Sequence, residues 1–138
     1  MQIDETVLPL YGTPLWSKMS ERQKSDLRYH AQVHNLSQFL HGEQGALICA
    51  ARIVQDVPTI ESKFYAATQV MDEARHVEAY RRLLKEKFAF VYPISKPLKT
   101  LLEQGLSTLR NPLEIDLGRL DLVKLEVFVA SIQRLANY

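Results

Sequence analysis

Two long segments of this chain carry helical apolar stripes, and a carboxylate lies in the middle of each stripe. Apolar residues recur with the i, i+3, i+4, i+7 spacing of one helix face from about residue 20 to 57, and again from 59 to about 88. Glu43 interrupts the first stripe and Glu73 interrupts the second. An ionised carboxylate on a buried face is costly unless it is paired or bound to a cation. The fold must therefore compensate both carboxylates.

Capping residues and a proline mark the ends of the first helix. Ser20 to Gln23 form a capping box, in which the serine caps the helix and the glutamine reaches back. Pro58 ends the apolar pattern, because proline cannot continue a helix. The segment between them is long for one helix, so we expect a break near Gly42 or Gly45.

The rest of the chain continues the helical pattern. Thr59 can cap the second helix, which runs to about Phe88. A shorter helix is predicted over residues 98–109, and Asp121 can cap a last helix over 122–136. No β alternation and no internal repeat is evident. The sequence therefore predicts an all-α protein, with an antiparallel helical bundle as its natural architecture.

Composition excludes several classes of protein. Seventeen basic and sixteen acidic residues leave a net charge of +1, which argues against a broad basic surface for nucleic acid. The single cysteine, Cys49, excludes an internal disulfide and fits a reducing compartment. No run of 18 apolar residues exists, so we expect no membrane span. The first residues lack the pattern of a secretory signal, and we expect a cytoplasmic protein.

The spacing of three polar residues suggests a metal site. Glu73 and His76 are three residues apart, so they point the same way on a helix. Glu43 lies thirty residues before Glu73, with Pro58 about midway, and an antiparallel hairpin would bring the two carboxylates level. One helix giving Glu and the next giving Glu-x-x-His is half of a di-metal bundle site, suited to iron or manganese. The alternative has no metal: the glutamate is a surface residue, and the histidine makes its hydrogen bonds to other groups of the protein.

The segment around His76 resembles a known family. Residues 72–76, Asp-Glu-Ala-Arg-His, match the Asp-Glu-x-Arg-His signature of ferritin-like di-iron oxygenases, which include bacterial multicomponent monooxygenase hydroxylases. Residues 39–46 and 64–77 are similar to bacterial ferritin-like proteins of the ribonucleotide-reductase-like group. The resemblance covers about residues 14–105 and is strongest over 37–84. It implies a ferritin-like antiparallel helical bundle with a carboxylate-bound pair of iron ions.

The same resemblance assigns roles to individual residues. It makes Glu43 a terminal or bridging carboxylate, Glu73 the bridging carboxylate and His76 the imidazole ligand. It gives Asp72 and Arg75 a supporting role, because such residues orient the ligating imidazole and raise its basicity.

Tyr80 lies one helical turn beyond His76 and has two interpretations. In the radical-generating subunit of ribonucleotide reductase a redox tyrosine lies four residues after the corresponding histidine, so the resemblance makes Tyr80 a candidate catalytic residue. The other interpretation is a core tyrosine whose hydroxyl reaches a polar network. We favour the core interpretation, because a fold alone does not confer radical chemistry.

The chain departs from the family in its later part. It has no second Glu-x-x-His, and the candidate carboxylate of a later helix, Glu126, is followed three residues on by Val129. We predict an irregular arm over residues 1–19 and a ferritin-like helical domain over 20–138, of which 107–138 is divergent.

Two consequences of this departure compete. In one, a homodimer or higher oligomer supplies four carboxylates and two imidazoles, as encapsulated ferritins do across a dimer. In the other, the chain has lost its metal and survives as a helical scaffold. Our main hypothesis is an oxidoreductase that uses iron, or iron and manganese, to activate dioxygen on a small substrate. The alternatives are a metal-free dimerisation scaffold and ferritin-type iron oxidation and storage.

Three further histidines form a separate group. His30, His34 and His41 share one helix face, opposite to Glu43. They are ligands of a second transition-metal site, or they form a polar outer face, or they are packed histidines, and no acidic residue accompanies them. We favour the two interpretations without a metal.

Overall fold

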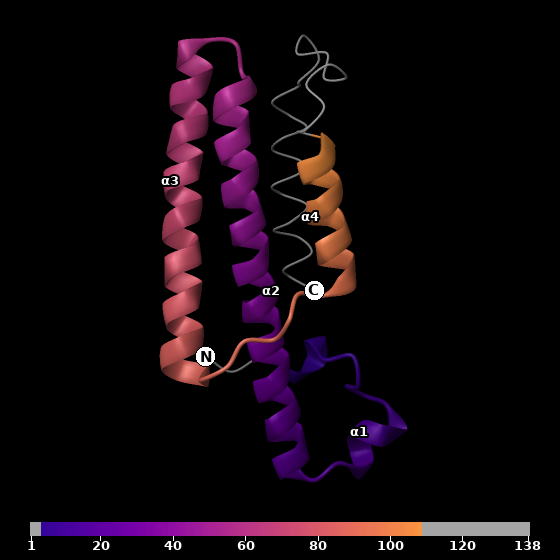
Figure 1. The fold of residues 1–138 in the computed structure, drawn as a ribbon. Coiled ribbons are helices and arrows are strands. Elements are labelled where there is room, and N and C mark those ends of the chain that lie inside the picture. The colour runs from indigo at the N-terminus through magenta and orange to yellow at the C-terminus, as the bar shows by residue number, and fades with distance from the viewer. Residues whose placement is uncertain (1–3, 109–138) are drawn as a thin grey trace.

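The computed structural model describes residues 4–108, and these residues are almost entirely helical (Figure 1). In chain order the elements are η1 (Glu5–Val7), α1 (Pro14–Lys18), α2 (Glu21–Asp56), α3 (Ile60–Leu83), η2 (Leu84–Phe88) and α4 (Lys96–Thr108). No β-strand occurs within the described part of the chain. The predicted all-α class is confirmed for the described residues. Asp121, the helix expected over 122–136 and Glu126 lie outside the described residues.

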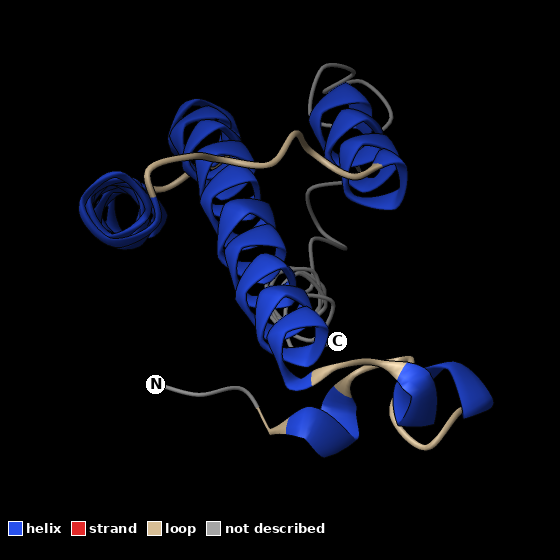
Figure 2. Cartoon of the chain, turned by 90° about the horizontal axis from the view of Figure 1, so that it is seen from below, coloured by secondary structure: helices blue, strands red, loops and turns tan. Residues whose placement is uncertain are grey.

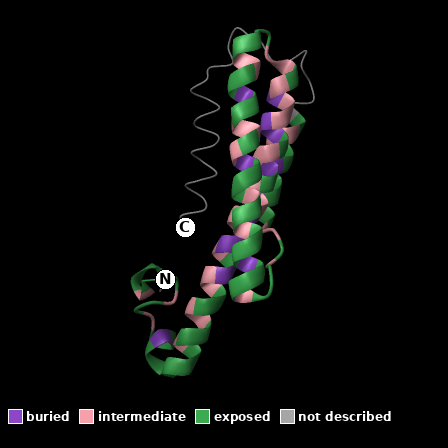
Figure 3. Ribbon diagram, turned by 90° about the vertical axis from the view of Figure 1, so that its left-hand side faces the viewer, coloured by how far each residue is buried: buried purple, intermediate pink, exposed green. Residues whose placement is uncertain are grey.

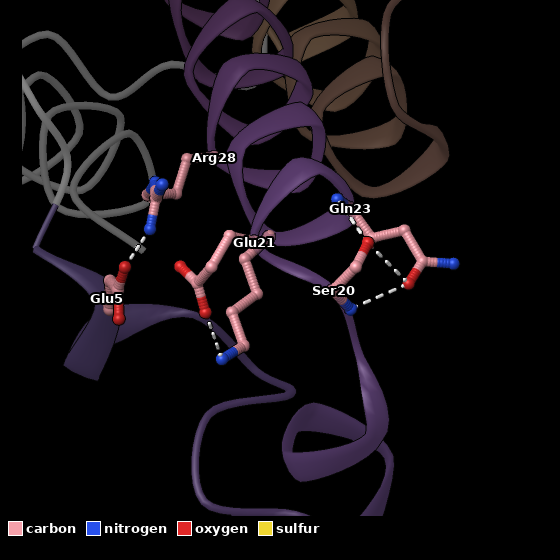
Figure 4. A network of polar contacts seen from close by, with 6 residues as sticks. Glu5, Ser20, Glu21, Gln23 and Arg28 are labelled. Carbon is pink, nitrogen blue, oxygen red and sulfur yellow. Dashed lines mark hydrogen bonds and ion pairs between the residues drawn. The ribbon is translucent and has the colours of Figure 1, made fainter.

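Helix α2 begins at the predicted capping box. The Gln23 N–H donates to Ser20 Oγ at 3.3 Å, and the Ser20 N–H donates to Gln23 Oε1 at 2.9 Å (Figure 4). The helix ends at Asp56, just before Pro58. An ion pair between Glu5 and Arg28 ties the N-terminal arm to α2, and Trp16 of α1 is buried.

The expected break at the glycines of α2 is wrong, because the helix runs unbroken for 36 residues. Gly45 has a packing role instead. A Cβ at Gly45 would lie 2.8 Å from Leu102 Cδ1, which is far inside van der Waals contact. The missing side chain therefore lets α4 approach α2 closely.

Helix α3 folds back along α2 as an antiparallel neighbour (Figure 1). Thr59 caps it as predicted, since Thr59 Oγ1 accepts from the Ser62 N–H at 3.2 Å. The Lys63 ammonium closes the hairpin by donating to the carbonyls of Val54 and Gln55 at 2.8 and 3.0 Å. These last carbonyls of α2 have no partner within their own helix, and the lysine satisfies them.

The other end of α3 turns through one π-helical turn, η2, and stops at Ala89. Ala89 has a left-handed backbone, with φ of 62°, and its N–H donates to the Leu84 carbonyl at 2.9 Å. Tyr29 of α2 donates its hydroxyl proton to the Phe88 carbonyl at 3.0 Å. The two helices are therefore linked at both ends of the hairpin.

The connection over residues 89–95, here named the strap, lies against α2. The Tyr92 N–H donates to Ser37 Oγ at 3.0 Å, and Ser37 in turn donates to the Val33 carbonyl at 2.7 Å. The Gln38 side-chain amide makes two hydrogen bonds to the strap. Its Nε2 donates to the Pro93 carbonyl at 3.0 Å, and its Oε1 accepts from the Ser95 N–H at 2.7 Å.

Helix α2 lies between α3 and α4 (Figure 2). The main core, formed by Val33, Leu36, Leu40 and Leu84, fills the side toward α3 and η2. Leu98 and Leu102 of α4 are also buried. The side of α3 away from α2 carries no helix among the described residues (Figure 3). None of the described helices is long and apolar enough to span a bilayer.

Candidate metal centre

The antiparallel hairpin brings three predicted ligands together. Glu43 comes from the middle of α2, and Glu73 and His76 come from successive turns of α3. One ligand atom from each of the three residues lies within 4.8 Å of the other two. The predicted meeting of these three side chains is therefore found in the structure.

The distances within the cluster suit a shared cation. His76 Nδ1 lies 3.4 Å from Glu43 Oε2 and 3.4 Å from Glu73 Oε2. Charge-assisted hydrogen bonds are shorter, at about 2.7 to 2.9 Å. Ligand atoms about 2.1 Å from one ion, at octahedral or tetrahedral angles, lie about 3.0 to 3.4 Å apart. The three residues present therefore fit a transition-metal ion.

Burial changes steeply across the cluster. The Glu73 side chain is 9% exposed, that of Glu43 is 21% exposed, and that of His76 is 53% exposed. The buried Glu73 Oε2 has no hydrogen-bond partner in the described part of the chain. A buried carboxylate oxygen without a partner is unfavourable, and a bound cation would satisfy it.

The electrostatics of the cluster lead to the same conclusion. Burial first, and then the adjacent Glu43 carboxylate, raise the pKa of Glu73, and the His76 imidazole lowers it, so that the pKa rises from 4.5 to about 7 in all. Without a cation the site therefore does not readily hold two negative charges near neutral pH. Metal binding would release the proton that Glu73 retains.

Tyr80 packs as a core residue beside the cluster. Its ring stacks on Phe39, with centroids 5.5 Å apart and planes 7° from parallel, and it contacts the main core. Burial and the Glu43 charge raise the pKa of its hydroxyl. Phe39 was not singled out as a site neighbour in the sequence. The sequence does contain a signal for it. Phe39 lies one turn before Glu43 and Tyr80 lies one turn after His76, and in an antiparallel hairpin these two positions are level with each other.

Asp72 and Arg75 lie on the exposed side of α3. Arg75 donates to Asp72 Oδ1 at 3.1 Å, and its other nitrogen lies 3.7 Å from Met71 Sδ. Among the described residues, no hydrogen bond joins either side chain to His76. Their predicted role in orienting the imidazole stays a prediction.

The three other histidines contact the strap and not the cluster. His30 Nδ1 shares a hydrogen bond of 2.9 Å with the Tyr92 hydroxyl, and His41 Nε2 lies 2.9 Å from the Tyr92 carbonyl oxygen. The His34 ring makes an edge contact with the Tyr92 ring. Contacts with the strap therefore account for these residues, which agrees with one of the two interpretations without a metal.

The fold and the half-buried carboxylate–histidine cluster are those of a ferritin-like protein of the di-iron carboxylate class. Comparison with protein-family models is more specific, because residues 1–109 match the model of p-aminobenzoate N-oxygenase AurF. The chain belongs to this family, which is a di-iron, ferritin-like family. The three predicted ligands, Glu43, Glu73 and His76, lie within the matched segment. Searches of curated proteins and of solved structures found no match.

Proposed function

We propose that Glu43, Glu73 and His76 bind iron, and that the protein uses this iron to oxygenate a small organic substrate. The observation that carries the proposal is the buried Glu73 Oε2, which makes no hydrogen bond to the described residues and lies 3.4 Å from an imidazole nitrogen that also faces Glu43. When bound by carboxylates and imidazole, iron supplies the activation of dioxygen. Manganese suits the same ligands and is the alternative metal.

Each of the three side chains has a separate task in this proposal. Glu73 provides a buried anionic oxygen and releases its proton when the cation binds. His76 provides Nδ1 as a neutral ligand, and its exposed ring leaves a side of the site accessible from solvent. Glu43 provides the second carboxylate from α2, so the cation joins the two helices of the hairpin.

The name of the matched family suggests the substrate class. The family model describes an N-oxygenase of p-aminobenzoate. For this chain we propose a primary aromatic amine. One oxygen atom of dioxygen would enter an N–H bond to give a hydroxylamine, and the other would leave as water. Two electrons and two protons from an external reductant complete the balance.

Metal binding by a matched pair of variants tests the proposal. Fe(II) affinity is measured anaerobically by titration calorimetry, and iron per chain is measured by plasma mass spectrometry. We expect Glu73→Gln to weaken Fe(II) binding at least about tenfold, whereas Glu78→Gln, the same change at an exposed position of α3, should not. Equal binding by the Glu73 variant would refute the site.

A second function, oxidation of iron itself, is favoured by the exposure of His76, because free iron can reach the cluster from solvent. Oxygen consumption distinguishes the two functions. Uptake that requires an added aromatic amine supports the oxygenase. Uptake driven by Fe(II) alone supports ferritin-type oxidation. Absence of metal binding would leave the helical scaffold as the remaining hypothesis.

A further inference from the structure

We propose that an acidic one-electron carrier protein docks on residues 81–91, at one end of the hairpin, and supplies the electrons for the metal centre. This surface, here named the basic end, comprises the last turn of α3, η2 and the first residues of the strap. The inference rests on the proposed function, which needs an external reductant. It adds the class of that reductant and the surface that receives it.

The first argument is the set of cations at the basic end, which lies at the lower end of α3 in Figure 1. Arg82 pairs with Glu86 at 3.4 Å. The other three cations, Arg81, Lys85 and Lys87, are exposed and make no ion pair with the described residues. Carboxylates of a partner protein can therefore pair with them.

The second argument is the difference in charge along the hairpin. Residues 78–91 carry four cations and two carboxylates, whereas residues 35–77, which contain the metal ligands, carry three cations and five carboxylates. An acidic protein is therefore attracted to the basic end in preference to the half that binds the metal. The cluster is open to solvent at His76, so the carrier and a small substrate approach different parts of the molecule.

The third argument is the apolar surface among these cations. Leu83 is 37% exposed, Phe90 is 38% exposed and Val91 is 45% exposed. The dipole of α3 favours cations near its carboxyl end, but it does not account for exposed apolar side chains there. A small apolar patch surrounded by charge is typical of the surfaces that form transient redox complexes, because charge steers the encounter and the buried area is small.

The fourth argument is a packed route from the basic end to the metal ligands. Phe88 of η2 packs against the main core, and its ring lies 5.7 Å from that of Tyr29. Tyr80 packs against the same core, stacks on Phe39 at 5.5 Å, and lies one turn beyond His76. One core therefore contacts both the basic end and the aromatic pair beside the ligands.

The length of this route is suitable for electron transfer. Leu84, the fully buried core residue at the start of η2, lies eight residues after His76. The helical rise places it about 12 Å from the ligand along the axis of α3. Electrons cross such distances through packed protein. Each turnover of the proposed reaction takes two electrons, so two reduced carriers are each oxidised by one electron, and the two protons come from solvent.

Binding of a carrier to the metal-free chain tests the surface. The probe is an acidic plant-type [2Fe–2S] ferredoxin, and basic cytochrome c is the comparison. We expect titration calorimetry to show ferredoxin binding that weakens at least about tenfold between roughly 0.05 and 0.5 M salt, because salt screens the attraction. Cytochrome c should not bind. Failure of ferredoxin to bind would overturn the inference and leave the metal site intact.

Three charge reversals test the position of the surface. Lys85→Glu and Lys87→Glu should each weaken ferredoxin binding at least about fivefold at low salt. Lys96→Glu is the matched control, because Lys96 is also exposed and makes no ion pair with the described residues, but it begins α4 on the other side of α2 (Figure 2). Circular dichroism verifies that the variants fold. Equal weakening by the control variant would overturn the assigned surface.

Stopped-flow spectroscopy tests the electron-transfer role. Reduced ferredoxin is mixed without oxygen with the oxidised, iron-loaded protein, and its reoxidation is followed. We expect Lys85→Glu to slow reoxidation at low ferredoxin concentration by about the factor by which it weakens binding, and Lys96→Glu to leave the rate unchanged. Binding of ferredoxin without reoxidation would overturn the role.

Two other outcomes are distinguishable from these. Binding of phosphatidylserine vesicles in place of ferredoxin, with loss in the Lys85 and Lys87 variants, would assign the basic end to a membrane surface and overturn the inference. Absence of iron binding by the wild-type chain would overturn the proposed function, and the inference with it.

Discussion

Replacing Glu73 by glutamine should stabilise the metal-free protein, and it should do so only above acidic pH. Burial and the neighbouring Glu43 carboxylate raise the pKa of this carboxyl from 4.5 to about 7, so the folded state holds the proton more tightly than the unfolded state. Below pH 4.5 the group is protonated in both states and the charge has no effect. As the pH rises from 4.5 to 7, the unfolded state ionises first, and the native protein loses stability relative to it.

The size of this effect follows from the pKa. A rise from 4.5 to about 7 corresponds to about 3 kcal/mol of lost stability above pH 7. The side chain is only 9% exposed, so screening by water reduces this little. We expect Glu73→Gln to recover about 2 to 3 kcal/mol at pH 8.

Urea denaturation followed by circular dichroism, at pH 5 and pH 8 in the presence of a chelator, measures this difference. Glu78→Gln is the control, because it makes the same change at an exposed position of the same helix. Bound metal should narrow this difference. At a hundredfold excess over the wild-type dissociation constant, Mn(II) should add about 2.7 kcal/mol to the wild-type protein and, because the variant binds at least about tenfold more weakly, at most about 1.4 kcal/mol to the variant. A metal-free variant no more stable than wild type at pH 8 would refute the reasoning.

Three further predictions concern the packing around the hairpin. In Gly45→Ala the new Cβ would collide with the Leu102 side chain, which costs about 1 to 3 kcal/mol, whereas alanine gains about 1 kcal/mol over glycine inside a helix; we therefore expect a net loss of about 0 to 2 kcal/mol in urea denaturation, with cleavage in α4 on limited proteolysis and unchanged Fe(II) affinity. Ser37→Ala should cost about 1 to 3 kcal/mol by the same measurement, because it leaves the Tyr92 N–H unpaired; Ser17→Ala, at an exposed position, is the control. Tyr80→Phe keeps the ring stack, so we expect the stability and the oxygen uptake of the iron-loaded protein to stay near wild type; loss of uptake together with loss of a tyrosyl radical spectrum would instead support a redox role.

Local signals in the sequence predicted the hairpin well. The capping box at Ser20, the cap at Thr59 and Pro58 act within one turn of their own position, so helix ends can be read from neighbouring residues. The meeting of Glu43 with Glu73 was also predictable, because buried charge requires compensation and a hairpin allows one register for it.

Features that depend on distant contacts could not be predicted in this way. The expected break in α2 was wrong because Gly45 serves the approach of α4, which no local pattern reveals. Ala89 adopts a left-handed backbone conformation, which the sequence does not predict because glycine is the usual residue there. The exposure gradient from Glu73 to His76 depends on which side of α3 is left uncovered, and this is a property of the assembled helices.

The hydrogen bonds at the two ends of the hairpin affect how much the protein must reorganise when an ion binds. Lys63 ties α3 to the end of α2 near Pro58, and Tyr29 ties α2 to the far end of α3 through the Phe88 carbonyl. Helices fastened at both ends cannot slide past each other, so the axial offset between Glu43 and His76 is set before any ion arrives. Little conformational entropy is then lost on binding, and more of the interaction energy appears as affinity. The hairpin is therefore a preorganised receptor, in which helices held together far from the ligands limit the reorganisation needed at them.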